Sequence, residues 1–142
     1  MRKLVLAATA SLGLVMSVAV ANAANIVAKI DLSDQTMTVY KNGFRKYKWK
    51  VSTARNGYVT PTGQYTVKWA SKNHRSRKYN NAPMPYSLFF HGGYAVHGTT
   101  DLKRLGRPAS HGCVRLDPKN AATLFSMAQE AGLGQTRIVI RK

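Results

Sequence analysis

The stretch Ser110-His111-Gly112-Cys113-Val114-Arg115-Leu116 separates two kinds of sequence pattern, and that change of pattern indicates the fold. Before it, apolar and polar residues alternate with a period of two, which is typical of strands. Directly after it, Asp117-Pro118 has the form of a helix N-cap followed by proline at the first helical position. Apolar residues then recur at helical spacing until Gly132, a helix stop signal. We therefore expect Cys113 to lie between a strand and one helix.

Alternation begins near the amino terminus of the predicted domain. Residues 25–31 and 35–41 read as strands, and Asn42-Gly43 is a strong signal for a tight hairpin. In residues 46–51 three lysines alternate with Tyr47, Trp49 and Val51. We therefore expect the lysines on one face of a strand and the aromatic side chains on the core face.

Further strands are predicted later in the chain, at residues 65–69, 86–90, 94–97 and 136–141, with Gly92-Gly93 as a second hairpin turn. Residues 71–85 are polar and basic, and we expect them to form a long loop, which either acts as a lid or binding loop or is locally disordered. About seven or eight strands and one main helix predict a mostly β, single-domain fold, a sandwich or a barrel.

Length and composition limit the class of protein. The 142 residues suffice for one domain of ordinary size, and 44% hydrophobic residues exclude a disordered basic tail. Lys and Arg number 22 against 5 Asp and Glu, a formal net charge of +17. Residues 35–100 carry no acidic side chain, so the excess charge is concentrated in the middle of the chain. A single cysteine excludes an intramolecular disulfide.

The first 23 residues have the pattern of a secretory signal peptide. Two basic residues precede an apolar stretch, and Ala21-Asn22-Ala23 has the small-x-small form of a cleavage site. We expect a mature catalytic domain at residues 24–142, exported and most simply periplasmic, because no lipobox cysteine or sorting tail is present. The alternative is a retained membrane anchor. No later segment is apolar enough to span a bilayer.

Cys113 and His97 together suggest nucleophilic catalysis. Twelve residues separate His97, at the end of a predicted strand, from Ser110. A loop of that length can bring an imidazole to the thiol, as a cysteine–histidine pair requires. We expect nearby amides and basic side chains to lower the pKa of the thiol. The amides of Gly112 and Cys113 could form an oxyanion hole.

These residues also allow a structural role or a zinc site. A lone cysteine is commonly a small buried apolar residue, and His97 could be a buried histidine with a structural hydrogen bond. His91, His97, His111 and Cys113 could in principle bind zinc, but they show none of the usual short paired spacings. We expect no metal and no cofactor.

With these residues identified, the chain resembles the L,D-transpeptidase catalytic domain family, of the YkuD type. The resemblance rests on several segments in order, namely residues 30–33, 36–40, 51–53, 60–63, 84–86, 97–99 and 110–116. It implies a β-sandwich-like domain that acts on peptidoglycan tetrapeptide stems outside the cytoplasmic membrane. The cysteine would form a thioester with release of D-alanine, and an acceptor amine would then complete a 3–3 cross-link. Sensitivity to carbapenems is also implied.

The resemblance also implies roles for individual residues. Cys113 would be the nucleophile and His97 the base, with the Gly98 carbonyl orienting the ring and the Gly112 and Cys113 amides forming the oxyanion hole. The expected substrate contacts are Ser110, His111, Arg115 and Tyr86, of which Arg115 would bind a carboxylate or amide of the stem. The alternative for Arg115 is an ion pair with Asp101 or Asp117.

Other functions stay open from the sequence. The same site with water as acceptor would be an L,D-carboxypeptidase, and a protein acceptor or donor would make it attach or release an envelope protein. A non-catalytic, basic wall-binding module is a further alternative. The charge and interleaved aromatics also suggest a nucleic-acid binder, but the signal peptide argues against it, and we expect no specific nucleic acid. We expect basic residues at 46–50 and 72–78 to contact anionic envelope polymers, unless they serve solubility alone.

Overall fold

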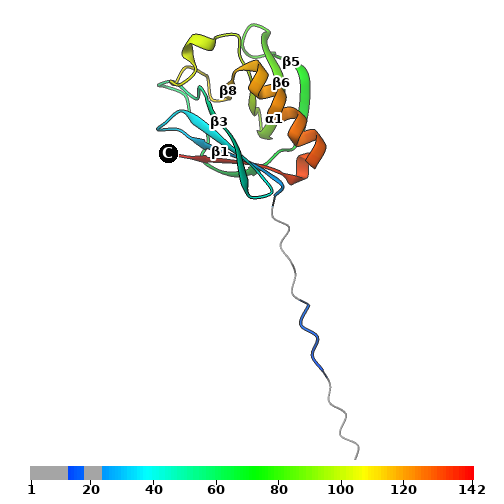
Figure 1. The fold of residues 1–142 in the computed structure, drawn as a ribbon. Coiled ribbons are helices and arrows are strands. Elements are labelled where there is room, and N and C mark those ends of the chain that lie inside the picture. The colour runs from blue at the N-terminus through cyan, green and yellow to red at the C-terminus, as the bar shows by residue number, and fades with distance from the viewer. Residues whose placement is uncertain (1–12, 18–23) are drawn as a thin grey trace, which may run out of the picture.

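The structure, a computed structural model, describes residues 13–17 and 24–142. The signal-peptide prediction covers residues 1–23, most of which lie outside the described residues. Residues 13–17 belong to no helix or strand. In the described part of the chain, nine strands form two sheets, and one α-helix packs beside them (Figure 1). None of the helices in that part is both long and apolar enough to cross a membrane.

The first sheet has five strands in the order β3-β2-β1-β9-β4. Their bounds are Ile26–Asp31 for β1, Thr36–Lys41 for β2, Phe44–Lys50 for β3, Gly63–Thr66 for β4 and Thr136–Arg141 for β9. The β1–β9 pair is parallel and the other pairs are antiparallel. Asn42 and Gly43 both have positive φ, 50° and 82°, as a tight hairpin turn between twisted strands requires. The predicted hairpin is confirmed.

The second sheet has four strands in the order β5-β6-β7-β8. Their bounds are Trp69–Ser76 for β5, Ala82–His91 for β6, Tyr94–Gly98 for β7 and Val114–Leu116 for β8. Helix α1, Pro118–Ala131, follows β8 and packs on β6 and β7. The Asp117 carboxylate accepts a hydrogen bond from the Lys119 N–H at 2.9 Å. This is the predicted N-cap, and short 3-10 helices lie at Leu102–Arg104 and Leu133–Gln135.

Both sheets and the helix share one apolar core. It includes Ile30 of β1, Met37 of β2, Phe90 of β6, Leu124 of α1 and Ile138 of β9, each no more than 1% exposed. The sheets do not close into a barrel. The prediction of a mostly β, sandwich-like domain with one main helix is therefore confirmed.

The predicted loop at residues 71–85 is wrong, because this segment forms most of the β5–β6 hairpin. The two strands pair from Trp69 opposite Phe89 to Ser76 opposite Ala82. The outer half of the hairpin extends beyond the sheet, since β7 pairs with β6 only from Leu88 onward. Most side chains there face solvent, so the sequence lacks the apolar alternation of a half-buried strand.

The segment at residues 65–69, predicted as one strand, is divided between the two sheets. The Val67 N–H donates to the Thr136 carbonyl in the first sheet at 3.0 Å, and the Lys68 N–H donates to the Phe89 carbonyl in the second at 2.9 Å. Val67 is buried in the shared core. The apolar alternation continues across the crossover because both sheets face the same core.

Strand β3 lies at the edge of the first sheet, and this changes the expectation for its aromatic side chains. Tyr47 is 41% exposed and stacks on the half-buried Trp49, with ring centroids 4.8 Å apart. The prediction that the aromatic side chains of this segment lie on a core face is therefore wrong for Tyr47, which lies on an edge strand. The β3 lysines are typical of edge strands that resist pairing with another chain.

Candidate active site

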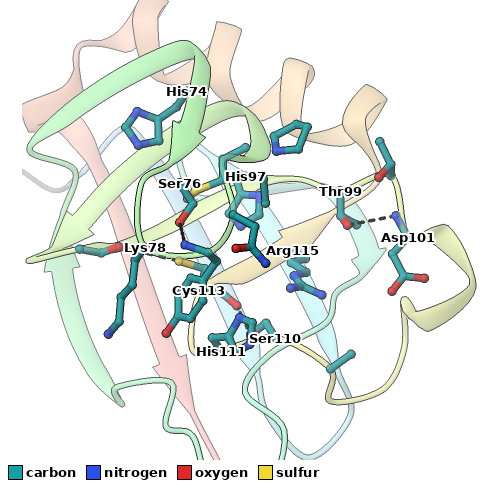
Figure 2. A pocket seen from close by; sticks show the side chains of 18 of the residues that line it. His74, Ser76, Lys78, His97, Thr99, Asp101, Ser110, His111, Cys113 and Arg115 are labelled. Carbon is teal, nitrogen blue, oxygen red and sulfur yellow. Dashed lines mark hydrogen bonds between the residues drawn. The ribbon is translucent and has the colours of Figure 1, made fainter.

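The motif of residues 110–116 forms one wall of a cavity of about 1020 Å³. The β5–β6 hairpin forms the opposite wall (Figure 2). Side chains from both walls line the cavity, among them His74, Tyr79, His97, His111, Cys113 and Arg115. The fold thus brings the strand-end histidine and the cysteine of the motif into a single cavity, as the sequence predicted.

His97, on β7, is held in one tautomer. Its Nδ1 lies 2.7 Å from the Gly98 carbonyl oxygen. Since a carbonyl can only accept, Nδ1 carries the proton and Nε2 has the free lone pair. The pKa of His97 is lowered to about 4, chiefly by burial and to a smaller extent by the Arg115 and His74 charges, against the effect of the Gly98 hydrogen bond. The ring is therefore a neutral base at pH 7.

Cys113 is also protonated at neutral pH. Its Sγ accepts a hydrogen bond from the Ala95 N–H at 3.4 Å and lies 3.8 Å from the Gly93 carbonyl oxygen, to which the thiol donates. Burial raises the pKa of the thiol above its usual 9.0, although the Ala95 amide and Arg115 act in the opposite direction. The expected lowering of the thiol pKa is wrong. The resting pair is a thiol and a neutral imidazole.

The turn before Cys113 is closed by the hydroxyl of Ser110. This hydroxyl donates to the Cys113 carbonyl at 2.6 Å and accepts from the Gly112 N–H at 3.0 Å. The Gly112 amide is thus already bonded, which corrects the prediction that it belongs to the oxyanion hole. Ser110 lines the cavity, as predicted, while its buried hydroxyl closes the turn.

Position 112 accepts only glycine. Its φ of +136° is rare for other residues. A Cβ built there would lie 2.5 Å from a ring carbon of Tyr94 and 2.9 Å from the Val59 carbonyl oxygen. The turn can therefore pack this closely against its neighbours only because residue 112 lacks a side chain.

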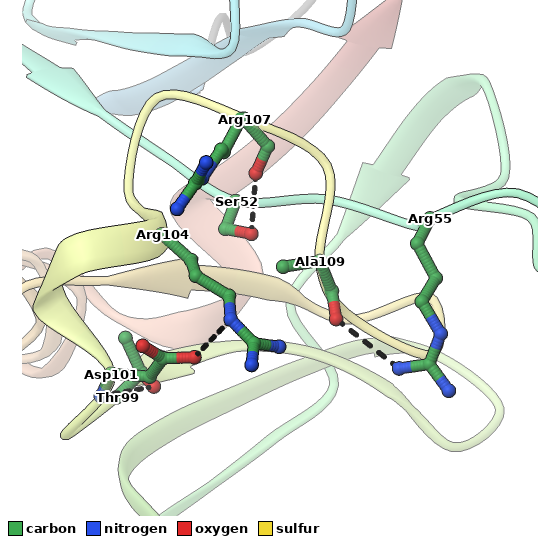
Figure 3. A network of polar contacts seen from close by, with 7 residues as sticks. All are labelled: Ser52, Arg55, Thr99, Asp101, Arg104, Arg107 and Ala109. Atoms are coloured by element: carbon green, nitrogen blue, oxygen red, sulfur yellow. Dashed lines mark hydrogen bonds and ion pairs between the residues drawn. The ribbon is translucent and has the colours of Figure 1, made fainter.

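A segment behind the motif keeps it in place. Ser52 and Arg115 exchange two backbone hydrogen bonds, at 3.0 and 2.8 Å, and the Arg55 N–H donates to the Ser110 carbonyl at 3.0 Å. In the loop between His97 and Ser110, the Ser52 hydroxyl donates to the Arg107 carbonyl at 2.7 Å (Figure 3). The motif is thus attached at both ends to the segment at residues 52–55.

His111 joins the motif to the tip of the β5–β6 hairpin. The Tyr79 ring stacks on its imidazole at 3.9 Å, and Tyr58 meets the ring edge-on. Arg55 Nη2 lies 3.1 Å from its Nε2, which must accept because a guanidinium only donates. Burial lowers the pKa of His111, and the nearby Arg55, Arg115 and Lys78 charges add to that effect. His111 therefore contacts the hairpin as a neutral ring.

Arg115 faces the cavity with no carboxylate partner in the described chain. The alternative pairings fail, because Asp101 pairs with Arg104 at 3.1 Å (Figure 3) and Asp117 caps α1. Burial lowers the pKa of Arg115, against the attraction of Asp101, but leaves the guanidinium charged at pH 7. Basic side chains dominate the cavity wall, namely Arg55, Arg77, Lys78, Arg104 and Arg115, against the single acid Asp101.

The prediction that Tyr86 contacts the substrate is not supported by its position. This residue does not line the cavity; its ring meets Phe125 of α1 edge-on at 5.6 Å, and it packs against the core. Its φ of 55° marks an irregularity in β6 that turns the side chain toward the helix. Conversely, the cavity is also lined by Arg55, His74 and Tyr79, which could not be predicted because nothing in the sequence around them signals chemistry.

The zinc alternative has no support in the described residues, where no group of three His, Cys, Asp or Glu side chains converges on a metal site. His91 packs against the rings of Tyr65 and Tyr94 instead of lining the cavity.

Comparison with solved structures yields several close folds. An L,D-transpeptidase from Mycobacterium smegmatis has a TM-score of 0.74 and 23% identity, covering 83% of this chain and 59% of that one. An L,D-transpeptidase from Stackebrandtia nassauensis has a TM-score of 0.73 and 29% identity, over 83% and 56%. L,D-transpeptidase 3 from Mycobacterium tuberculosis, in complex with a faropenem-derived adduct, has a TM-score of 0.72 and 20% identity, over 83% and 60%.

The chain spans less than two thirds of the length of these structures. No curated protein sequence matched it. The sequence profile of the L,D-transpeptidase catalytic domain, YkuD, matches residues 25–140, which is nearly the whole described domain and includes His97 and the motif around Cys113. The chain therefore belongs to the L,D-transpeptidase catalytic domain family.

Proposed function

We propose that this protein is an exported L,D-transpeptidase that acts on peptidoglycan tetrapeptide stems. The observation that carries the proposal is the neutral His97, fixed by the Gly98 carbonyl, in the same cavity as Cys113. A base near a protonated thiol is what nucleophilic attack on an amide carbonyl needs. Family membership supports the same chemistry.

In the first half-reaction, Cys113 Sγ attacks the carbonyl carbon of the third stem residue. Nε2 of His97 takes the thiol proton, so charge develops on the carbonyl oxygen and not on a free thiolate. The Cys113 N–H stabilises that oxyanion. When the tetrahedral intermediate collapses, the bond to the terminal D-alanine breaks and His97 returns the proton to the leaving amine. A thioester on Cys113 remains.

In the second half-reaction, an acceptor amine of another stem attacks the thioester. His97 removes a proton from the attacking nitrogen, the carbon–sulfur bond breaks, and the sulfur regains its proton. The product is a 3–3 cross-link. Water in place of the amine would give a tripeptide, so the acceptor decides between transpeptidase and carboxypeptidase, and a protein amine would give attachment to an envelope protein.

The charge of the cavity supports a stem peptide as donor. Such stems carry several carboxylates, and five basic side chains face the cavity against one acid. Arg115, half-buried and without a carboxylate partner in the described part of the chain, offers two parallel N–H donors to a carboxylate. We assign it the recognition of a donor-stem carboxylate.

Products from purified disaccharide tetrapeptides test the proposed function. We expect mass spectrometry to show D-alanine release together with dimers linked through two third-position residues. Tripeptides without dimers would instead identify a carboxypeptidase, and intact substrate would contradict the proposal. Imipenem is a useful second acyl donor, because one L,D-transpeptidase with this fold is solved in complex with it.

We also propose that the protein acts in the periplasm and that its exposed basic strand β3 holds it to anionic envelope polymers. Arg45, Lys46 and Lys48 are exposed on β3 and do not line the cavity. The basic residues of the β5–β6 hairpin cannot be assigned to polymer binding alone, since Arg77 and Lys78 also line the cavity. Such surface charges attract a polyanion over about one Debye length, roughly 10 Å at 0.1 M salt.

Replacing Arg45, Lys46 and Lys48 by glutamine is expected to lower low-salt retention on isolated sacculi by about tenfold, because three adjacent positive charges are lost. Turnover of a soluble tetrapeptide should stay at the wild-type level. The matched control removes the same charge from the exposed Lys103, Lys119 and Lys142. An equal loss of retention in both variants would show that net charge alone, and not β3, holds the protein.

A further inference from the structure

We infer that Thr60 is a positioning residue that holds the peptide between Gly112 and Cys113 so that the Cys113 N–H faces the developing oxyanion. The inference rests on the proposed function, because it concerns the same acylation step. It gives a role to the stretch Thr60-Pro61-Thr62-Gly63, which the catalytic assignment leaves unused.

Thr60 is buried, with 5% exposure, and both functions of its hydroxyl are occupied. The hydroxyl donates to the Gly112 carbonyl at 2.7 Å and accepts from the Ala54 N–H at 3.0 Å. Ala54 in turn forms a backbone bridge with Ser110, the first residue of the motif. Thr60 therefore connects the motif to the segment that supports it from behind.

The planarity of the peptide bond converts this contact into an orientation of the nucleophile's own amide. The Gly112 carbonyl and the Cys113 N–H belong to one trans peptide unit, so they point in opposite directions. With the carbonyl held toward Thr60, the N–H must point away from Thr60. The peptide cannot rotate without breaking the bond to the threonine hydroxyl.

The neighbouring polar groups of the turn are also engaged. Ser110 holds the Gly112 N–H and the Cys113 carbonyl, and Thr60 holds the Gly112 carbonyl. Of the four backbone polar groups of these two residues, the Cys113 N–H is the one left for the substrate oxyanion. The hydroxyls of Ser110 and Thr60 thus bond the other three groups and leave the Cys113 N–H as the donor for the oxyanion.

A glycine makes such a constraint necessary. Gly112 has no Cβ, so steric repulsion opposes rotation of its flanking peptide units less than at any other residue. A Thr60 variant without the hydroxyl would leave a buried carbonyl unpaired, which favours a rotated peptide. Pro61 contributes by restricting Thr60 to extended backbone conformations, which keeps the hydroxyl in place.

The test compares two reactions of the same thiol in the Thr60→Val variant, which keeps the side-chain shape and loses the hydroxyl. Acylation by imipenem passes through a tetrahedral oxyanion, whereas alkylation by iodoacetamide is a direct displacement that forms none. We expect acylation to slow by about 100-fold, as for loss of an oxyanion donor, while alkylation changes less than about twofold. Thr60→Ser should restore acylation to within a few-fold of wild type.

Other outcomes overturn the inference. An equal slowing of both reactions would mean that Thr60 only maintains the fold around Cys113, and unchanged acylation would mean that it has no role. Thermal unfolding checks that each variant is folded, with Thr60→Ala as a second hydroxyl-free variant. Wild-type protein that iodoacetamide alkylates but neither imipenem nor a tetrapeptide acylates would overturn the proposed function itself, and the inference with it.

Discussion

Cys113→Ala is expected to abolish the release of D-alanine from a tetrapeptide stem, with a loss of at least about 1000-fold in turnover. Alanine keeps the Cβ and removes the sulfur, so no thioester can form. The fold should be retained, because the Cys113 side chain is only partly buried and packs beside Met84, Phe89 and Ala95, not in the main core. D-alanine release and the temperature of unfolding are the two measurements.

Two further variants separate the role of the nucleophile from that of the base. Cys113→Ser keeps an attacking atom of lower acidity, and we expect turnover close to that of Cys113→Ala. His97→Ala removes the base and leaves the thiol, so its acylation should fall while iodoacetamide still labels Cys113. Sacculus binding should stay at the wild-type level in the Cys113 variants. Undiminished D-alanine release by Cys113→Ala would refute the catalytic assignment.

Alkylation of Cys113 by iodoacetamide is expected to accelerate throughout the range from pH 7 to pH 9, by about tenfold between pH 7 and pH 8. The thiolate is the reactive form, and burial raises the thiol pKa above 9.0, so its fraction rises with pH throughout this range. His97, with its pKa lowered to about 4, carries no charge that could stabilise a thiolate near neutral pH. The measurement is the labelling rate across a pH series.

The opposite arrangement, a thiolate beside an imidazolium, would give a different curve. The rate would reach a plateau near pH 5 or 6, and substitution of His97 would remove that plateau. For the resting pair described above, His97→Asn should leave the profile above pH 7 nearly unchanged while acylation by imipenem is lost. A low-pH plateau in the wild-type protein would contradict the neutral pair.

Much of the fold follows from local patterns whose physical basis is short in range. Asn42-Gly43 predicts its hairpin because both residues readily take positive φ, and Asp117-Pro118 predicts the helix start because each supplies one element of a helix N-terminus. The cavity pairing of His97 with Cys113 also follows from the sequence, since each residue adjoins a strand end and a glycine.

Features that depend on tertiary context could not be predicted in this way. Most side chains of the outer β5–β6 hairpin face solvent, so the period-two signal is missing there although the strands pair. Tyr86 turns toward α1 because of its positive φ, which nothing in an aromatic residue indicates. The Gly112 N–H donates to the Ser110 hydroxyl, a contact that depends on how the turn folds. The pKa of the Cys113 thiol rises because burial outweighs the nearby positive charge.

Intact-protein mass spectrometry of the acyl-enzyme tests the central claim most directly. Wild-type protein in molar excess over a disaccharide tetrapeptide is quenched in acid within the first turnover, before the amine of a second stem can resolve the thioester, and is mapped by peptide digestion. We predict an adduct on Cys113 equal in mass to the stem without its terminal D-alanine, with D-alanine released in equal amount. Release of D-alanine while Cys113 stays unmodified at every quench time, or while it is blocked by prior alkylation, would contradict the account.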